Sequence, residues 1–408
     1  MEQSNPNWKR KAILFFFSQS VTLFGSTLVS FAIVWYVTLK TSSGGWVALL
    51  TVCSFLPQTL VSFVSGALAD RYSKKWLIIG SDAAIAVATL ALALLLPSLG
   101  ESNGVLAALL FASVIRSIGA GIQLPAVGAI IPQFVPEEHL MRVNGINATL
   151  QSVVQFAAPA AAGAILSLGT LRSTLWIDIV TAAVDIGFLA CLAMPRQQSL
   201  PETQAPFVSD LKEGIRYIRQ NRFFEKLLFL YGLFILLSVP GGFLASLLVA
   251  RVYGGSYLNL TIVELVGFAG MTAGGVLIGV WGGFKNRVKT LLIGVAACGL
   301  LTIGMGSVRQ FLLYLAMILF MGVAITMAQT AVTTLVQERA NPAMQGRMFG
   351  LIGTMYSGFL LIGMSVFGPL ADHVSLPLLM VLTGGALAVV ALLYRFSKAF
   401  CKMPAANE

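Results

Sequence analysis

Five acidic or basic side chains lie within long apolar stretches of this sequence. Arg116 lies in the middle of one stretch, Asp178 and Asp185 share another, and Asp82 and Glu264 lie in two more. A carboxyl in apolar surroundings favours its protonated form, so it can bind and release a proton as its access to water changes. We therefore predict that these residues are candidates for proton coupling, Glu264 and Asp185 first.

Each of these residues also has a structural interpretation. A charged group in the middle of a bilayer costs at least about 2.5–3.5 kcal/mol, so it needs a polar partner or a water-filled cavity. Arg116 is followed by small residues and can bind a neighbouring helix. Asp82 and Asp178 lie near the ends of their stretches, which favours caps or helix interfaces. Asp178 and Asp185 are seven residues apart and so share one helix face.

The elements that carry these residues are transmembrane helices. The 408 residues are 57% hydrophobic and only 10% charged, which is outside the range of soluble globular proteins. Apolar segments of about 20 residues, without the alternation of barrel strands, indicate helices. The sequence predicts an all-α membrane protein with twelve transmembrane helices, near residues 12–39, 46–69, 76–97, 104–128, 144–168, 173–194, 227–250, 258–283, 288–308, 311–335, 348–370 and 376–394.

The basic residues predict the orientation. If the N-terminus is cytoplasmic, most of the 26 lysines and arginines lie in inside segments. The outside segments hold only Lys40, Arg172, Arg251 and Arg309. This bias predicts that both termini of this multi-pass protein are cytoplasmic. It also accounts for the net charge of +10 without a nucleic-acid partner, because the charges are spread over short loops.

The longest polar interval divides the chain into two halves of six spans. We predict an N-terminal bundle at residues 1–195, a cytoplasmic linker at 196–226 and a C-terminal bundle with its tail at 227–408. Within the linker, SDLKEGIRYIRQNRFFEKLL (209–228) has apolar residues near helical spacing with basic residues between them. This pattern indicates either an amphipathic helix at the membrane surface or a solvated connecting helix.

Two pairs of loops indicate that the halves are repeats. GALADRYSKKWLIIG (66–80) matches VWGGFKNRVKTLLIG (280–294), and VPEEHLMRVNG (135–145) matches NPAMQGRMFG (341–350). Both pairs fall in topologically equivalent loops. Two similar six-helix halves around a central cavity are typical of carriers that work by alternating access.

The whole chain resembles transporters of the major facilitator superfamily. GALADRYSKK (66–75) is similar to the signature of that superfamily between helices two and three. RSIGAGIQLPA (116–126), VPEEHLMRVNG (135–145) and TIVELVGFAG (261–270) resemble the branch that contains macrolide efflux proteins and the enterobactin exporter. Our leading hypothesis is a secondary active exporter in a bacterial cytoplasmic (inner) membrane, which moves an amphipathic organic compound, a macrolide-like drug, out of the cytoplasm by proton antiport. Export of a siderophore or lipid-like metabolite and a non-transporting membrane sensor are the alternatives.

The charged loop at 66–80 predicts a cytoplasmic gate. Asp70 ends the second helix at the face where the eleventh helix begins, near Arg347. A carboxylate at a helix N-terminus is stabilised by about 0.3–2 kcal/mol, and the superfamily's equivalent Asp is implicated in such a gate. We expect Asp70 to latch the halves together, with Arg71, Lys74 and Lys75 as latch partners or orientation signals. Phe284 replaces the Asp in the second copy, so the latch is one-sided.

Polar residues in other spans predict a cavity. The superfamily's architecture places helices one, four, seven and ten around it, which favours Gln19, Gln123, Phe234 and Gln329 as lining residues; hydrogen bonding between helices is the alternative for each Gln. The first span holds Gln19 as its one strong polar group and no acid, unlike many multidrug antiporters. Pro240-Gly241-Gly242 should interrupt the seventh helix.

Other classes of protein fit less well. His139 and His373 are the only histidines, and no zinc-protease, serine-hydrolase or phosphate-loop motif is present. We therefore expect no enzyme activity, no catalytic residues, no bound metal and no cofactor beyond a proton gradient. The expected partners are a small-molecule substrate and the lipid bilayer, and the expected state is a monomer.

Overall fold

The structure is a computed structural model, and it describes residues 8–100, 103–133, 135–192 and 216–397. The side chains of residues 63, 66, 67, 69–71, 103, 137 and 343 lie outside the described part. Most of the predicted linker, up to residue 215, also lies outside it. Residues 216–220 are helical, and the next helix begins at Arg222.

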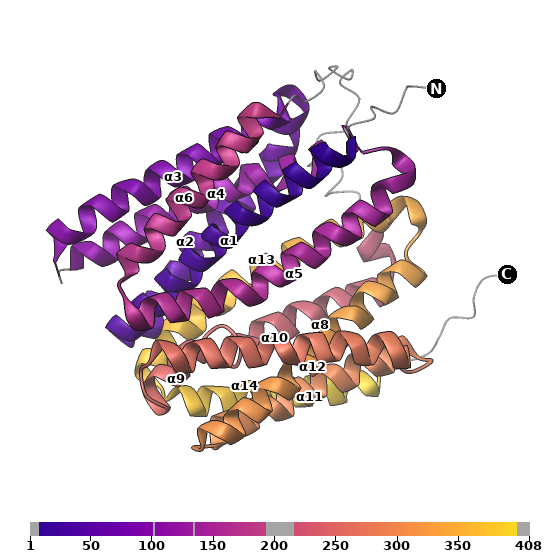
Figure 1. Cartoon of the computed structure of the whole chain (residues 1–408). Helices are drawn as coiled ribbons and strands as arrows, with labels where there is room; N and C mark the ends of the chain where they lie inside the picture. The colour runs from indigo at the N-terminus through magenta and orange to yellow at the C-terminus, as the bar shows by residue number, and fades with distance from the viewer. Residues whose placement is uncertain (1–7, 101–102, 134, 193–215, 398–408) are drawn as a thin grey trace. The chain divides into compact units, whose positions relative to one another are not determined.

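The described residues form α-helices and two short 3-10 turns, with no strand among them (Figure 1). The helices are α1 (Trp8–Thr41), α2 (Gly44–Arg71), α3 (Lys74–Leu99), α4 (Asn103–Ile130), α5 (Glu137–Leu168), α6 (Leu171–Cys191), α8 (Arg222–Ser238), α9 (Ala245–Val252), α10 (Tyr257–Trp281), α11 (Arg287–Ser307), α12 (Phe311–Arg339), α13 (Gln345–His373) and α14 (Leu376–Arg395). The 3-10 turns, Ile131–Gln133 and Pro342–Met344, precede α5 and α13.

Eleven of the described helices are long and apolar enough to cross a membrane, which confirms an all-α membrane protein. The predicted count of twelve is not reached, because the segment at 227–250 forms two shorter helices, α8 and α9. The break falls at Pro240-Gly241-Gly242, as predicted. Proline has no N–H to continue the helical ladder, and the N–H of Leu244 instead donates to the Val239 carbonyl at 3.1 Å.

The chain forms two compact units. Unit 1 contains residues 1–40, 49–203 and 256–261, and unit 2 contains residues 41–48, 204–255 and 262–408. The first turn of α2 thus belongs to unit 2, and the first turn of α10 belongs to unit 1. Elsewhere each unit consists of consecutive helices.

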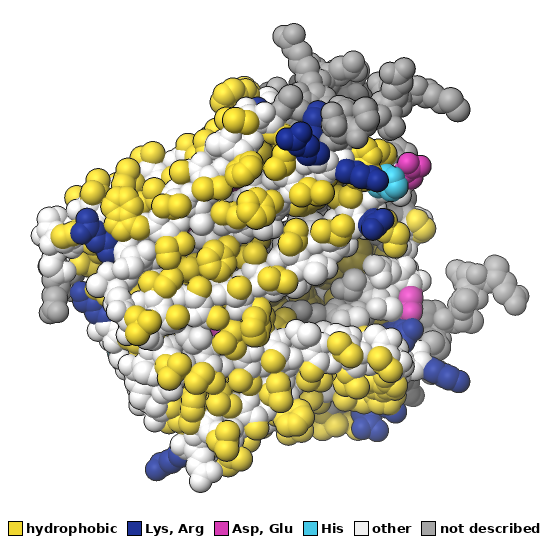
Figure 2. Space-filling model, in the orientation of Figure 1, with side chains coloured by type: hydrophobic (Ala, Val, Ile, Leu, Met, Phe, Trp, Pro, Cys, Tyr) yellow, Lys and Arg dark blue, Asp and Glu magenta, His cyan; other side chains and the backbone are white. Residues whose placement is uncertain are grey.

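Each unit has its own packing pattern. In unit 1, α3 packs against both α4 and α6. A buried apolar cluster that includes Phe15, Ile78, Ile130 and Leu189 joins α1, α3, α4 and α6. In unit 2, α11 packs against α12 and α14, and α8 packs against α13. Hydrophobic side chains cover the face drawn in Figure 2, with lysine and arginine at its margins. Such a surface suits contact with lipid, in which apolar groups are solvated and charges are not.

Candidate functional site: a two-layer polar network in unit 1

Four helices of unit 1 each contribute two polar residues that lie seven positions apart. These residues are Gln19 and Ser26 on α1, Asp82 and Thr89 on α3, Arg116 and Gln123 on α4, and Asp178 and Asp185 on α6. Seven residues span two helical turns, or about 10.5 Å of helix. The eight side chains therefore form two layers, each with one residue from every helix.

The first layer, the arginine layer, consists of Ser26, Thr89, Arg116 and Asp178. The Arg116 guanidinium forms an ion pair with the Asp178 carboxylate. It also donates to Thr89 Oγ1 at 2.7 Å and to the Ser26 carbonyl at 3.1 Å. Asp178 accepts further bonds from Ser26 Oγ at 3.2 Å and Thr89 Oγ1 at 3.0 Å. Both charges are buried, and their polar atoms are well satisfied, which a buried ion pair requires.

The second layer, the two-aspartate layer, consists of Gln19, Asp82, Gln123 and Asp185. Gln19 Nε2 donates to both carboxyl oxygens of Asp185, at 3.1 and 3.0 Å. Gln123 Nε2 donates to Asp82 Oδ1 at 2.8 Å. The two amides thus fix one carboxyl each, and they tie α1 to α6 and α4 to α3.

The two carboxyls of this layer interact with each other. Asp82 is 2% exposed and Asp185 is fully buried, and no cation belongs to the layer among the described residues. Asp82 Oδ2 is also buried, and no described group donates a hydrogen bond to it. A buried carboxylate pair without a counter-charge is costly. A proton held by one carboxyl removes the repulsion and supplies the missing donor.

The structure thus brings together six residues that the sequence analysis placed on separate spans. Arg116, Asp178, Asp82 and Asp185 were candidates for proton coupling, whereas Gln19 and Gln123 were candidates for the substrate cavity. Ser26 and Thr89 were not singled out. The repeated spacing of seven in four spans is the signal that would have found them.

Glu264 lies apart from this network, on α10 in unit 2. Its side chain is partly exposed, and no described group donates a hydrogen bond to it. It interacts electrostatically with Tyr314 of α12, whose hydroxyl is buried and without a partner among the described residues. Phe234 is buried on α8 beside Tyr231, at 6.5 Å between ring centroids. Gln329 is half-buried on α12. The roles predicted for these three residues stay predictions.

The predicted gate residues lie at the junction of α2 and α3 and at the start of α13. Asp70 and Arg71 end α2, and their side chains lie outside the described part of the chain. Lys74 is buried in the first turn of α3. Arg347 Nη1 contacts Met344 Sδ at 3.2 Å, at the start of α13. The latch stays a prediction.

Lys75 also has a clear structural role. Its Nζ donates to the carbonyls of Ala190 and Leu192, both at 2.9 Å, at the end of α6. The last carbonyls of a helix lack partners within that helix, and a cation there interacts favourably with the helix dipole. Lys75 therefore caps α6 within unit 1.

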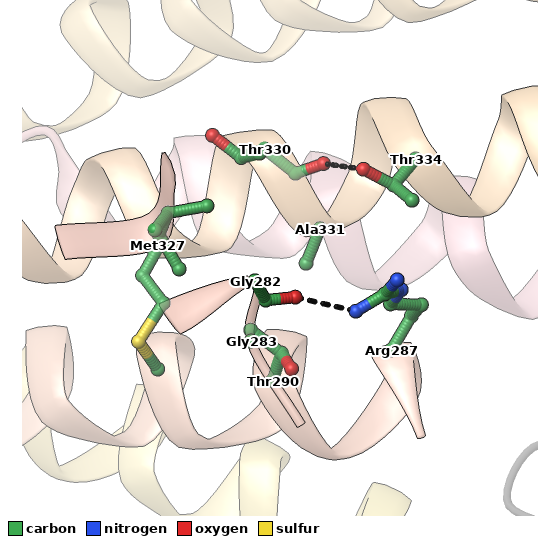
Figure 3. Close-up of a pocket in the computed structure, with 9 residues that line it drawn as sticks. Gly282, Gly283, Arg287, Thr290, Met327, Thr330, Ala331 and Thr334 are labelled. Carbon is green, nitrogen blue, oxygen red and sulfur yellow. Dashed lines mark hydrogen bonds between the residues drawn. The ribbon is translucent and has the colours of Figure 1, made fainter. Parts of the chain in front are cut away.

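A small cavity of about 80 Å³ lies in unit 2 between α10, α11 and α12 (Figure 3). Its lining residues are Ile278, Gly282, Gly283, Arg287, Thr290, Met327, Thr330, Ala331 and Thr334. Arg287 donates to the Gly282 carbonyl at 2.5 Å and to Glu338 Oε1 at 3.1 Å. Gly282 and Gly283 adopt φ angles of 73° and 75°, which suit glycine. Sites for drug-sized ligands occupy about 300–1,000 Å³, so this cavity is too small for a macrolide.

The helices, the repeat and the buried charges define the class as a multi-pass membrane carrier. Residues 15–364 match the Major Facilitator Superfamily. The chain belongs to this family, and it is therefore a membrane transporter and not an enzyme. This confirms the resemblance found in the sequence.

Individual relatives agree with this assignment. The chain is 29% identical to macrolide efflux protein A of Streptococcus pyogenes, over 96% of both chains. It is 22% identical to the multidrug efflux pump Tap of Mycobacterium bovis, over 90% of this chain and 88% of the relative. A solved bacterial homolog of the human lysosomal transporter Spinster, inward-facing and unoccupied, matches with a TM-score of 0.73 and 16% identity over 99% of this chain and 100% of that one. The last likeness shows the fold.

Proposed function

We propose that this protein is a secondary exporter that moves macrolide-like amphipathic compounds out of the bacterial cytoplasm by alternating access, in exchange for protons. The likeness to macrolide efflux protein A over 96% of both chains supports the substrate class. The likeness to a multidrug efflux pump supports the direction of transport. The distribution of lysine and arginine supports cytoplasmic termini.

The observation that carries the proton-coupling part is the two-aspartate layer. Asp82 and Asp185 are buried side by side with no cation in their layer among the described residues, and Asp82 Oδ2 lacks a donor. The arginine layer differs, because Asp178 already has Arg116 as its counter-charge. We assign the exchanged proton to the Asp82–Asp185 pair and a permanent structural charge to Asp178.

The surrounding side chains suit this exchange. While the layer is closed to water, one proton lowers the charge of the pair from −2 to −1, and the Gln19 and Gln123 amides donate to the pair. When water reaches the layer, the ionised carboxylates are solvated, and the Gln19 and Gln123 amides already point donors at them. The four helices that carry the layer are the same ones that carry the arginine layer. A change in protonation therefore changes the charge at the centre of unit 1, where helix packing responds to it.

Transport in proteoliposomes tests the proposal. Purified protein is reconstituted, a proton gradient is imposed, and accumulation of radiolabelled erythromycin is measured together with gradient-free counterflow. We expect gradient-driven accumulation by the wild type. We expect Asp82→Asn and Asp185→Asn to lose most of that accumulation but to keep counterflow. Arg309→Gln, which removes an exposed charge outside the network, is the control.

Two results would contradict the proposal. Erythromycin accumulation that needs no gradient excludes proton antiport, and unchanged gradient-driven accumulation by the Asp82→Asn/Asp185→Asn double variant excludes this pair as the carrier. A panel that contains a siderophore and a lipid-like compound shows whether the macrolide is the preferred substrate.

A further inference from the structure

The first turn of α2 is held on unit 2 by a single carboxylate. Asp372, at the end of α13, accepts from the N–H groups of Gly44 at 2.7 Å and Gly45 at 2.9 Å, and from Ser43 Oγ at 2.7 Å. These N–H groups belong to the N-terminus of α2 and have no partner within that helix. A carboxylate here also interacts favourably with the positive end of the helix dipole.

Arg251, from the last turn of α9, completes the contact. It donates to Asp372 Oδ1 at 2.7 Å and to the Ala371 carbonyl at 2.6 Å. It also donates twice to the Ser42 carbonyl, at 2.9 and 2.5 Å. One guanidinium therefore binds both the end of α13 and the residue that precedes α2. We call this arrangement of Asp372 and Arg251 around residues 42–45 the clasp.

Close backbone packing accompanies the clasp. A Cβ atom on Gly44 would lie 2.2 Å from the Gly368 carbonyl oxygen, and a Cβ atom on Gly368 would lie 2.2 Å from Ala48 Cβ. Only glycine allows such an approach at these two positions. The start of α2 and the end of α13 therefore fit together without intervening side chains.

The repeat-related helix makes a similar contact in the other unit, but without the clasp. Residues 256–261, at the start of α10, belong to unit 1, where a Cβ atom on Gly163 of α5 would lie 1.7 Å from Thr261 Oγ1. α10 and α5 are the counterparts of α2 and α13 in the internal repeat. No ion pair involves this segment among the described residues. Both helix starts are thus packed against glycine, and one of them is also held by charge.

We propose that the clasp is an outer gate, which holds the start of α2 on unit 2 while the substrate cavity is closed to the outside and releases it when the cavity opens outward. The proposal rests on the proposed export function and orientation, which place residues 42–45, 251 and 372 on the outside. Residues 41–48 join α1 to the rest of α2, and both of those belong to unit 1. Release of the clasp therefore frees unit 2 from a segment that is covalently continuous with unit 1 on both sides.

The gate is polar and reversible for a physical reason. The donors and acceptors of the clasp are partly exposed, with Arg251 and Asp372 side chains each 28% accessible. Water can therefore replace each hydrogen bond when the segment leaves.

Labelling of one cysteine in intact cells tests the gate. In a background with the four cysteines replaced, Val47→Cys places a thiol at a residue that is 1% exposed in the docked segment. A membrane-impermeant maleimide added outside should react slowly. Asp372→Asn and Arg251→Gln each remove charge-assisted hydrogen bonds, so we expect labelling to become about tenfold faster or more, and erythromycin export to fall.

Two controls and one steric variant separate the gate from general damage. Glu338→Gln removes an ion pair of similar exposure elsewhere in unit 2, and Arg309→Gln removes another exposed arginine that the orientation places outside. Both should leave labelling unchanged. Gly368→Ala leaves every charge in place but displaces the segment sterically, so it should also accelerate labelling. It therefore tests the gate even if an Asp372 variant fails to fold.

The outcomes are distinct. Equal labelling of Asp372→Asn, Gly368→Ala and the two controls would overturn the gate. If Asp372→Asn and Gly368→Ala are labelled faster than the controls but the protein with an intact clasp exports no macrolide, the gate is supported and the proposed substrate is contradicted.

Discussion

Arg116 and Asp178 form an ion pair between α4 and α6 whose side chains are only 9% and 1% exposed. Thr89 Oγ1 lies between them in the hydrogen-bond pattern, because it accepts from Arg116 and donates to Asp178. Ser26 of α1 also bonds to both side chains, so the pair joins four helices of unit 1 in one cluster. Removal of one partner would leave the other charge buried and unpaired.

The first prediction concerns the stability of this pair. Arg116→Met and Asp178→Asn should each destabilise the protein by about 3–5 kcal/mol, the usual cost of breaking a buried ion pair. The double variant should lose clearly less than the sum of the two, because it leaves no net buried charge. Thermal unfolding of the purified protein in detergent measures all four members of the cycle. Strictly additive losses would show that the two side chains do not interact.

The second prediction separates two lysines that occupy equivalent places in the repeat, Lys75 and Lys289. Lys75 donates to two carbonyls at the end of α6, whereas Lys289 lies over the Phe284 ring, with its Nζ 4.7 Å from the centroid. Lys75→Met should therefore cost about 1–2 kcal/mol, and Lys289→Met less than about 1 kcal/mol.

Thermal stability of the two variants in the same detergent gives the comparison. If Lys75 were only an orientation signal or a gate partner, both variants would be equally stable. Transport assays on Lys75→Met then show whether the lysine has a second role in gating.

Most of the fold could be predicted from the sequence, because crossing a membrane fixes the length and polarity of each helix. The α11 and α12 spans begin within one residue of their predicted starts. The prediction was wrong where 137–143 was assigned to a loop, since α5 begins at Glu137, directly after Pro136. Hydropathy detects only the apolar part of a helix. The first turns of α5 contain Glu137, Glu138 and Arg142, so they were not recognised as helical.

The candidate site was only partly predictable. A charged residue in an apolar span stands out, so Arg116 and Asp185 were found, but their partners are on other helices, and one sequence does not give helix neighbours. The outer clasp was missed for a related reason. Asp372 and Arg251 are far apart in sequence and lie at helix ends, where charged residues are common.

The third prediction compares two neighbouring tyrosines of unit 2, Tyr253 and Tyr314, whose ring centroids are 5.0 Å apart. The Tyr253 hydroxyl donates to the Val308 carbonyl at 2.6 Å, whereas the Tyr314 hydroxyl is buried without a partner among the described residues. Tyr253→Phe should therefore cost about 1 kcal/mol, and Tyr314→Phe should be neutral or stabilising. Thermal unfolding measures both.

A transport assay adds a second result for Tyr314. If Tyr314→Phe is as stable as the wild type but exports less erythromycin, its hydroxyl has a partner in another conformation. Glu264, which interacts electrostatically with Tyr314, is the candidate for that partner. A stability loss equal to that of Tyr253→Phe would contradict the assigned difference in hydrogen bonding.

The fourth prediction decides between two roles for Gln19. The sequence predicts that it lines the substrate cavity, whereas its amide donates to both oxygens of Asp185 in unit 1. If the network role dominates, Gln19→Leu should abolish most proton-driven accumulation of erythromycin but change KM in gradient-free counterflow less than about twofold, since uniform binding would be untouched. Gln329→Leu, on a half-buried residue of α12, is the matched comparison. A large increase in KM for Gln19→Leu with normal gradient-driven accumulation would instead place Gln19 in contact with substrate. It would also show that the two-aspartate layer exchanges its proton without the bonds from the Gln19 amide to Asp185.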